Sequence, residues 1–286
     1  MLNKKCQKLR EIITRPGFSI APCAYDALSV KAIELAGFEV AGTTGYGMHG
    51  AMLGTPDNGL LAFNEMVNAL GKMADAVSIP IMADAEGGYG NAINTIRTIH
   101  EFEKAGIAGL FIEDQKIPTN CPFIKKPESI SIDEMIGKIK AAVDTRQDKD
   151  FIIVARTDAP FEEAIERSNA YLAAGADMVK IIPKSRKELE AYPAKINGPI
   201  HLGFIANKGI NDGMTAADAG KLGYKIITFP MAGLFASTAA LINMMQYIKE
   251  HGTDEGYDKQ ALKFDEYMKF IGIDNYKSQS AKYIKD

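Results

Sequence analysis

The sequence predicts a (β/α)8 barrel, because eight short apolar or β-branched segments alternate with amphipathic stretches of helical periodicity. This alternation favours parallel strands, since each helical crossover returns the chain to the same end of the sheet. The length of 286 residues fits one such barrel with a terminal extension. No Gly-x-Gly-x-x-Gly pattern follows the first strand, so a doubly wound open sheet is the less favoured alternative.

The predicted strands are short runs bounded by turn residues. In chain order they are Ser19–Pro22, Phe38–Thr43, Ile79–Ala83, Gly109–Ile112, Phe151–Ala155, Met178–Ile182, Ile200–Ile205 and Lys225–Phe229. The helices between and after them are Asp26–Ala36, Asn64–Ala76, Ala92–Ala105, Ile132–Arg146, Phe161–Ala174, Ser185–Ile196, Thr215–Leu222 and Leu234–His251. Several helices are followed by glycine, which adopts the left-handed conformation that closes a helix, at Gly37, Gly106, Gly175 and Gly223.

The chain is predicted to divide into a catalytic barrel over residues 1–251 and a C-terminal helical extension over residues 252–286. The extension contains an amphipathic stretch, Tyr257–Ile271, with apolar residues at Leu262, Phe264, Tyr267, Met268 and Phe270. Such a helix either covers the flank of its own barrel or is exchanged onto a neighbouring subunit. The sequence leaves both alternatives open.

Composition favours a globular protein that acts on a small molecule. Hydrophobic residues make up 47% and charged residues 24%, and the net charge of -3 offers no basic footprint for nucleic acid or an anionic membrane surface. The three cysteines show no spacing typical of a disulfide framework or a zinc site. With no signal peptide or membrane-spanning run, we expect a soluble, cytoplasmic protein.

Polar side chains follow most of the predicted strands, at the end where barrel enzymes place their active sites. They are Thr43, Thr44, Gly45, Asp84, Glu86, Glu113, Asp114, Arg156, Thr157, Asp158 and Asn207. The carboxylates of Asp84, Glu86 and Glu113 would crowd negative charge into one mouth, which a hard divalent cation would compensate. Oxygen ligands without a nearby histidine favour Mg²⁺, with Mn²⁺ as the alternative.

Arg156 follows the fifth strand, beside these acids. Its guanidinium could clamp a carboxylate or phosphoryl group of the substrate in a bidentate manner. Alternatively it is an ion-pair partner of Asp158 or Asp114. The residues alone leave both interpretations open.

Five motifs resemble those of the isocitrate lyase and phosphoenolpyruvate mutase superfamily, over nearly the whole chain. They are Tyr-Asp-Ala-Leu-Ser at residues 25–29, Leu-Gly-Thr-Pro-Asp at 53–57, Asp-Ala-Glu-Gly-Gly-Tyr-Gly at 84–90, Ile-Glu-Asp-Gln at 112–115 and Ala-Arg-Thr-Asp-Ala at 155–159. The third departs from the usual pattern, because Glu86 stands where the superfamily has aspartate.

The resemblance implies a metal-dependent barrel that acts on a small carboxylate substrate through a metal-stabilised enolate, and it implies a homotetramer. The metal site would be Asp84, with Asp57, Glu86 and Glu113 completing it largely through water. The substrate would be held by Thr44, Gly45, Tyr46, Arg156 and Asn207, and Cys121 would be the catalytic acid or base.

The loop after the fourth strand matches no branch of the superfamily. Carbon–carbon lyases carry Lys-Arg-Cys-Gly-His or Lys-Lys-Cys-Gly-His there, whereas this chain has Thr-Asn-Cys-Pro-Phe at residues 119–123. Cys121 is retained, but the flanking cations that would lower its pKa are not. The mutase branch carries Lys-Thr-Asn-Ser, which Thr119, Asn120 and Cys121 resemble with Cys in place of Ser.

The leading hypothesis is therefore a Mg²⁺-dependent lyase that splits a 2-hydroxy dicarboxylate, of the methylisocitrate or dimethylmalate type. A phosphonomutase or phosphonopyruvate hydrolase acting on a C–P bond is the second, and an oxaloacetate decarboxylase is the third. A binding protein that retains the metal site is the non-enzymatic alternative.

Overall fold

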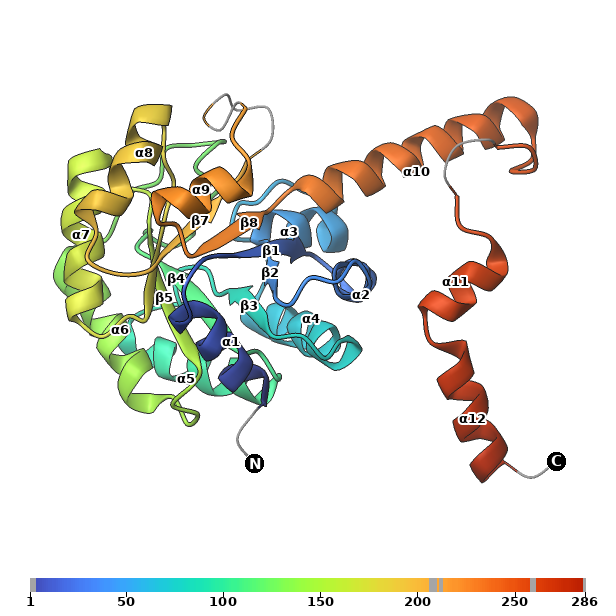
Figure 1. Ribbon diagram of the computed structural model, residues 1–286, viewed down its shortest axis with the longest axis horizontal. Coiled ribbons are helices and arrows are strands. Elements are labelled where there is room, and N and C mark those ends of the chain that lie inside the picture. The colour runs from blue at the N-terminus through green and yellow to red at the C-terminus, as the bar shows by residue number, and fades with distance from the viewer. Residues whose placement is uncertain (1–3, 206–209, 211–212, 258–260, 285–286) are drawn as a thin grey trace. The chain divides into compact units, whose positions relative to one another are not determined.

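Eight parallel strands close into a barrel in the computed structural model of the chain, which describes residues 4–205, 210, 213–257 and 261–284 (Figure 1). The strands are β1 (Ser19–Ala24), β2 (Ala41–Thr43), β3 (Ile81–Asp84), β4 (Gly109–Glu113), β5 (Ile152–Thr157), β6 (Met178–Ile181), β7 (Ile200–Gly203) and β8 (Ile226–Phe229). They pair in chain order, and β1 closes the ring on β8. The predicted barrel is confirmed.

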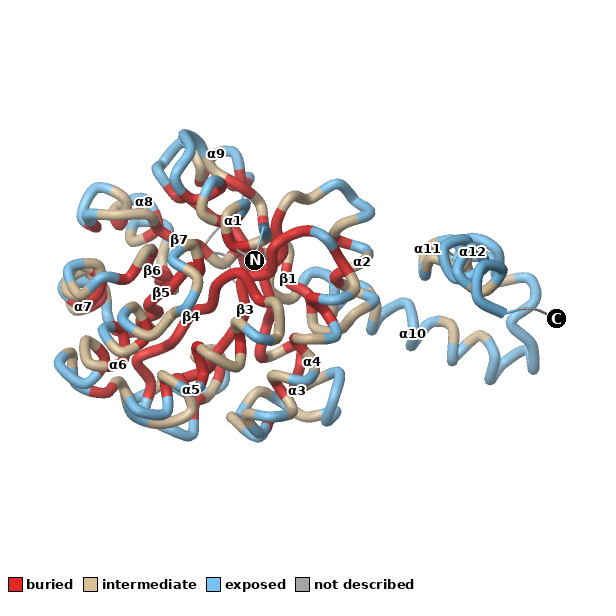
Figure 2. Tube along the Cα trace, turned by 90° about the horizontal axis from the view of Figure 1, so that it is seen from below, coloured by how far each residue is buried: buried red, intermediate tan, exposed pale blue. Residues whose placement is uncertain are grey.

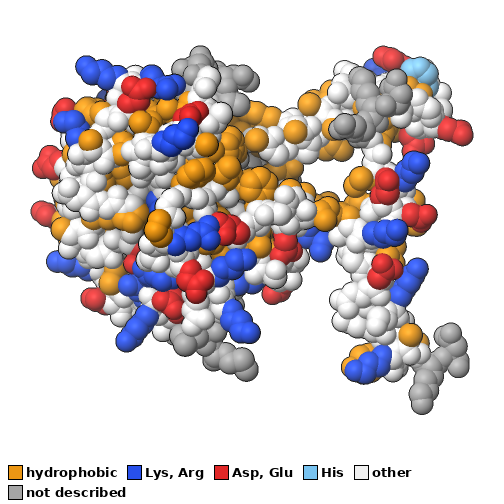
Figure 3. Space-filling view, in the orientation of Figure 1, with side chains coloured by type: hydrophobic (Ala, Val, Ile, Leu, Met, Phe, Trp, Pro, Cys, Tyr) orange, Lys and Arg blue, Asp and Glu red, His pale blue; other side chains and the backbone are white. Residues whose placement is uncertain are grey.

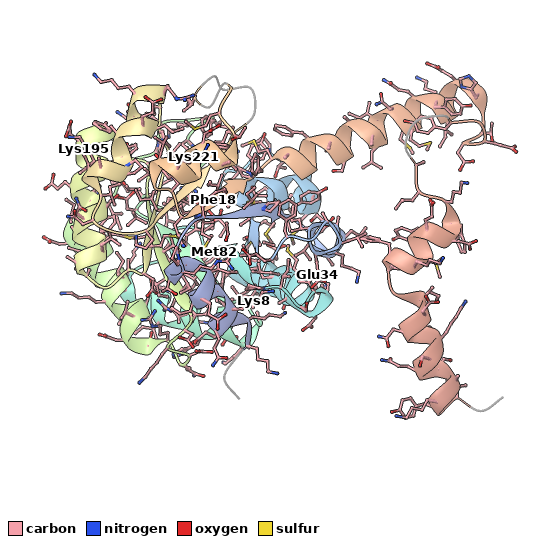
Figure 4. All side chains as sticks on the ribbon, viewed as in Figure 1. Lys8, Phe18, Glu34, Met82, Lys195 and Lys221 are labelled. Atoms are coloured by element: carbon pink, nitrogen blue, oxygen red, sulfur yellow. The ribbon has the colours of Figure 1, made fainter. Side chains whose placement is uncertain are left out.

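The barrel helices follow the strands and form its outer layer (Figure 1). They are α2 (Ala27–Leu35), α4 (Phe63–Ala76), α5 (Ala92–Lys104), α6 (Ile132–Thr145), α7 (Phe161–Ala173), α8 (Arg186–Lys195) and α9 (Ala216–Leu222). Helix α10 (Ala232–His251) follows β8 and has no buried residue. Figure 2 shows the strands buried and the outer faces of these helices exposed. Met82 on β3, for example, is fully buried and lies among the barrel strands (Figure 4).

Two further helices, α1 (Lys4–Thr14) and α3 (Gly45–Leu53), were not predicted from the sequence. Helix α1 buries Leu9 and Ile12 against the barrel, near the residues that begin β4 and β5. A Cβ atom added to Gly109 would lie 2.7 Å from the Cβ of Ile152 and 3.0 Å from a methyl group of Leu9. The glycine at the start of β4 therefore allows the helix to pack closely against this end of the barrel.

The chain forms two compact units, residues 1–234 and residues 235–286. The predicted division at residue 251, which concerns where the catalytic domain ends, stays a prediction. Among the residues that the structure describes, no helix has the length and hydropathy needed to cross a membrane.

The helix predicted over Tyr257–Ile271 is wrong in extent. Residues 258–260 lie outside the described part of the chain, and the helix α11 spans only Phe264–Phe270. It begins where the Glu266 carboxylate accepts a hydrogen bond from the Lys263 amide. It ends before Gly272, whose φ of 91° is left-handed, and α12 (Ile273–Tyr283) follows. The end of the helix therefore agrees with the prediction to within one residue, and the error lies at its start, where residues 261–263 are not helical.

Candidate active site

A pocket of about 650 Å³, its open mouth included, lies at the carboxyl ends of the barrel strands. Nearly all of the site residues predicted from the sequence line it, namely Thr44, Gly45, Tyr46, Asp57, Asp84, Glu86, Glu113, Cys121 and Arg156. Asn207, the remaining predicted site residue, lies outside the described residues. The fold thus brings together residues from β3, β4 and β5, from α3 and from three loops.

Asp84 ends β3 and is held by backbone groups. Its carboxylate oxygens accept hydrogen bonds from the amide of Gly45, at 3.2 Å, and from the amide of Glu86, at 3.0 Å. Its own amide donates to Oγ1 of Thr43 at 2.9 Å. Backbone donors of this kind fix the orientation of the carboxylate toward the pocket.

Glu86 lies two residues beyond β3, in a left-handed backbone conformation with φ of 50°. Oε2 accepts a hydrogen bond from the Thr119 hydroxyl at 2.5 Å, whereas Oε1 is buried and has no hydrogen-bond partner. Burial, followed by the charges of Asp84 and Asp57, raises the pKa of Glu86 to about 8. A buried oxygen without a partner, next to other acids, is the environment that a bound cation would satisfy.

Asp57 reaches the same acids from the loop between α3 and α4. Its Oδ1 is also buried without a hydrogen-bond partner, and burial, followed by the charge of Asp84, raises its pKa. His49, Asp57 and Glu86 each offer one potential ligand atom within 4.8 Å of the others. The group therefore has the spacing of a metal site, and the sequence had given no reason to include the histidine.

His49 is already engaged through both ring nitrogens. Nε2 accepts from the amides of Leu60 and Leu61, at 3.1 and 3.3 Å, which leaves Nδ1 to donate to the carbonyl of Gly45 at 2.8 Å. This arrangement assigns the neutral tautomer with the proton on Nδ1 and leaves no lone pair for a metal. We conclude that His49 positions the loop that carries Asp57, and that the acids are the metal-type ligands.

Arg156 on β5 is tied to two carboxylates. Nη1 lies 2.8 Å from Oε2 of Glu113, its register partner on β4, and Nη2 lies 2.9 Å from Oδ2 of Asp158. Asp114, the other partner considered from the sequence, instead pairs with Arg167 at 3.1 Å and accepts from the Tyr171 hydroxyl. Both interpretations of Arg156 are therefore compatible with its place, because it lines the pocket and is also ion-paired.

Cys121 lies in the loop after β4, buried in the pocket wall. Its amide donates to the carbonyl of Asp57 at 3.3 Å, which joins this loop to the loop with the acids. Gln115 braces the loop from behind, because its Oε1 accepts from the Asn120 amide and its Nε2 donates to Asp158. Burial is the largest influence on the Cys121 thiol and raises its pKa.

Sequence reasoning missed other residues of the pocket. They are Lys180, Ile182, Gly203, Ile205, Thr228, Pro230 and Met231. Thr43 at the end of the second strand and the loop residues Asn120, Pro122 and Phe123, which the sequence analysis named without assigning them a binding role, line the pocket as well. Lys180 is the most informative of the missed residues, because it is a charged residue inside the buried strand β6. That anomaly was visible in the sequence as a lysine within the run Met178–Ile182.

The fold and the pocket define a barrel enzyme whose acidic mouth is suited to a divalent cation. A family model described as phosphoenolpyruvate phosphomutase matches residues 9–249. The chain belongs to this family, and with it to the phosphoenolpyruvate mutase and isocitrate lyase superfamily that the sequence motifs indicated.

Individual relatives resemble the chain over most of its length. The 2,3-dimethylmalate lyase of Eubacterium barkeri is 37% identical over 281 residues, which cover 96% of this chain and 97% of that protein. Among solved structures, a phosphoenolpyruvate phosphomutase from Streptomyces platensis subsp. rosaceus superposes with a TM-score of 0.91 at 29% identity, covering 98% and 99% of the two chains. Phosphonopyruvate hydrolase in complex with oxalate and Mg²⁺ gives a TM-score of 0.89 at 28% identity, covering 98% and 99%.

Proposed function

We propose that the protein is a Mg²⁺-dependent lyase that splits a 2-hydroxy dicarboxylate, of the 2,3-dimethylmalate or 2-methylisocitrate type, into a 2-oxo acid and a second carboxylate. The observation that carries the proposal is that the buried, unpartnered oxygens of Asp57 and Glu86 share one pocket with Cys121. The similarity to 2,3-dimethylmalate lyase over nearly the full chain supports it.

Asp84 would bind the cation directly, and Asp57, Glu86 and Glu113 would complete its shell largely through water. Their oxygen atoms and their excess of negative charge suit Mg²⁺, with Mn²⁺ as the alternative. When bound, the cation would neutralise negative charge that develops on the substrate oxygens as the bond breaks. The solved relative that contains Mg²⁺ supports this choice of ion.

The chain's own groups would perform the remaining steps. Thr44, Gly45 and Tyr46, at the start of α3, together with Arg156, would hold the carboxylate of the forming 2-oxo acid. A carboxylate of the acid cluster would accept the proton of the 2-hydroxyl group as its oxygen becomes the carbonyl of the 2-oxo acid. Cleavage then leaves an electron pair on the departing carbon, which needs a proton. The raised pKa of Cys121 keeps it as a thiol, the form that can donate that proton.

A second candidate, an enzyme that acts on a carbon–phosphorus bond, is favoured by one observation. Asn120, which lies in the loop that resembles the mutase branch, lines the pocket. A third candidate is an oxaloacetate decarboxylase, because oxaloacetate would not need the cationic side chains that the lyases carry beside the loop cysteine and that this loop lacks.

One panel of substrates separates these candidates. The protein is incubated with Mg²⁺ and, in turn, 2-methylisocitrate, 2,3-dimethylmalate, oxaloacetate, phosphonopyruvate and carboxyphosphonoenolpyruvate, and 2-oxo acid, CO₂ and phosphate are measured. Release of a 2-oxo acid from one of the first two supports the lyase. Phosphate release or phosphonate rearrangement without carbon–carbon cleavage would overturn it.

We also propose that the chain assembles as a homotetramer in which its C-terminal helices pack on a neighbouring copy. Helix α10 carries exposed apolar side chains, which Figure 3 shows along its surface, including Phe235, Leu241, Ile242 and Met245. Exposed apolar surface on this scale is typical of an interface.

The three cysteines are free, which suits a reducing compartment, and we propose a cytoplasmic location.

A further inference from the structure

Two cationic side chains, Arg156 and Lys180, line the pocket among the residues that the structure describes. They are neighbours in the register of β5 and β6, and both are 9% exposed. Arg156 is paired with Glu113 and Asp158, as described above. Its charge is therefore already balanced by the protein.

Lys180 forms no ion pair among the described residues. Its Nζ lies 3.5 Å from the centroid of the Phe111 ring, and within the described chain it has neither a carboxylate nor a hydrogen-bond acceptor in bonding range. A ring face attracts an ammonium group but accepts none of its three hydrogen bonds in the way that an oxygen does. The side chain thus presents unused donors in a pocket that it lines.

Burying an ammonium group without an anionic partner is unfavourable by several kcal/mol. Burial, followed by the charge of Arg156, lowers the pKa of Lys180 to about 8, so the group is still largely protonated at neutral pH. His201, its register partner on β7, does not compensate it, because burial and the charges of Lys180 and Arg156 lower the histidine pKa and keep it neutral. The charges of Asp84 and Asp158 raise the pKa of Lys180, but among the described residues neither carboxylate lies within ion-pair distance of its Nζ.

The surroundings of Lys180 differ from those of the acids. The carboxylates of Asp84, Glu86 and Glu113 come from the β3 and β4 ends, whereas Lys180 belongs to β6. The pocket residues Ile182, Ile205 and Met231, which follow β6, β7 and β8, are apolar and suit a branched carbon chain. A substrate that spans the pocket from the acids at β3 and β4 would therefore meet the ammonium group of Lys180 on the β6 side, with apolar residues at the ends of β6, β7 and β8 beside it.

We propose that Lys180 determines substrate specificity by binding the second carboxylate of the substrate, the one that is not held together with the 2-hydroxyl group at the acid cluster. The proposal rests on the proposed function, since it assigns the two ends of a 2-hydroxy dicarboxylate to two parts of one pocket. It identifies the feature that would make the enzyme select a diacid over a monoacid.

Two probes of equal chain length test it: 2-hydroxy-2-methylbutanedioate, a diacid, and 2-hydroxy-2-methylbutanoate, in which a methyl group replaces the distal carboxylate. Binding of each to the Mg²⁺-loaded protein is measured by calorimetry. In Lys180→Met, we expect the affinity for the diacid to fall about 10- to 100-fold, as for a lost charge-assisted hydrogen bond, and that for the monoacid to change less than about twofold. Methionine has similar length and burial preference, so the fold should be retained.

Lys195→Met is the matched control. This lysine also lies over an aromatic ring, that of Phe161 at 5.9 Å, but it is exposed at the end of α8, in the outer layer of helices (Figure 4). The Lys195→Met variant should leave the affinities for the diacid and the monoacid unchanged. An equal loss for both probes in Lys180→Met, or no loss for the diacid, would overturn the proposal.

The outcome is separable from that of the proposed function, because binding is measured without turnover. If no 2-hydroxy dicarboxylate is cleaved but the diacid still loses affinity selectively in Lys180→Met, the lyase proposal fails and the assignment of Lys180 stands. If a 2-hydroxy dicarboxylate is cleaved but Lys180→Met binds both probes like the wild type, the lyase proposal stands and the assignment of Lys180 fails.

Discussion

The backbone amide of Gly45 donates a hydrogen bond of 3.2 Å to Oδ2 of Asp84, so the first residue of α3 directly contacts the central acid of the pocket. A Cβ atom at position 45 would lie 3.1 Å from that oxygen and 3.1 Å from Oε1 of Glu86. Both distances are shorter than an ordinary van der Waals contact, and both oxygens belong to residues that we propose as ligands of the cation. The close approach of helix and acids therefore depends on glycine.

We expect Gly45→Ala to lower the affinity for Mg²⁺ or Mn²⁺ by about tenfold or more, because a displaced ligand shell commonly costs that much. Gly50→Ala, in the same helix, is the control, since a Cβ there would approach only a methyl group of Leu234, at 4.0 Å. Manganese binding followed by electron paramagnetic resonance measures both. Equal affinities in the two variants would contradict the role of the close approach.

Removing the Asp84 carboxylate should have the larger effect. We expect Asp84→Ala to reduce metal affinity and turnover by about a hundredfold or more, because its oxygens are those that the backbone orients. Asp133→Ala is the control, because it removes a carboxylate in the first turn of α6, outside the pocket. It should leave metal affinity and turnover unchanged. Wild-type turnover in Asp84→Ala would refute the metal assignment.

The raised pKa of Glu86 predicts how stability depends on pH. Its ordinary pKa is 4.5 and its folded pKa is about 8, so between these values the folded state holds a proton that the unfolded state has released. The stabilisation is fully present below about pH 4.5 and is lost as the pH rises toward 8. Metal-free protein should therefore lose on the order of 1 kcal/mol of stability per pH unit in this range.

A bound divalent cation would replace that proton, so excess Mg²⁺ should flatten the decline, and metal binding should release protons. Thermal unfolding in chelator and in Mg²⁺, at several pH values across this window, tests both points. Parallel curves with and without Mg²⁺ would show that Glu86 does not face the cation.

The interface proposed for the C-terminal helices predicts a change of assembly. Ile242 on α10 is 51% exposed, and we expect Ile242→Asp to weaken subunit association, because burial of such a side chain is worth about 1.5–3 kcal/mol per copy. Gln246→Asp adds the same charge at an exposed polar position of α10 and is the control. Light scattering after gel filtration gives the mass of each, and an unchanged mass for Ile242→Asp would argue against this surface.

Much of the barrel could be predicted from the sequence, because buried parallel strands and amphipathic helices carry different periodicities. Helix α3 could not, since glycines at its start and within it obscure the helical pattern. The clustering of the acids was predictable, because strands that pair in chain order place the ends of consecutive strands next to each other. The partner of Arg156 was not, because the choice between Asp158 and Asp114 depends on Arg167, which is distant in sequence.

Cys121 provides the test that distinguishes the branches of the superfamily. In a lyase, Cys121→Ser replaces the proton donor by a far weaker acid, and we expect turnover to fall by about 10²- to 10⁴-fold. In a decarboxylase the departing group is CO₂ and the pocket has less need of this donor, so the change should be less than about tenfold. Cys6→Ser, on α1, controls for placing a hydroxyl in a buried thiol position, because Cys6 is buried but does not line the pocket. The assay uses the substrate that the wild-type enzyme turns over, and the affinity of each variant for that substrate is measured as well. If Cys121→Ser lowers only this affinity, Cys121 forms part of the pocket wall and is not the catalytic acid.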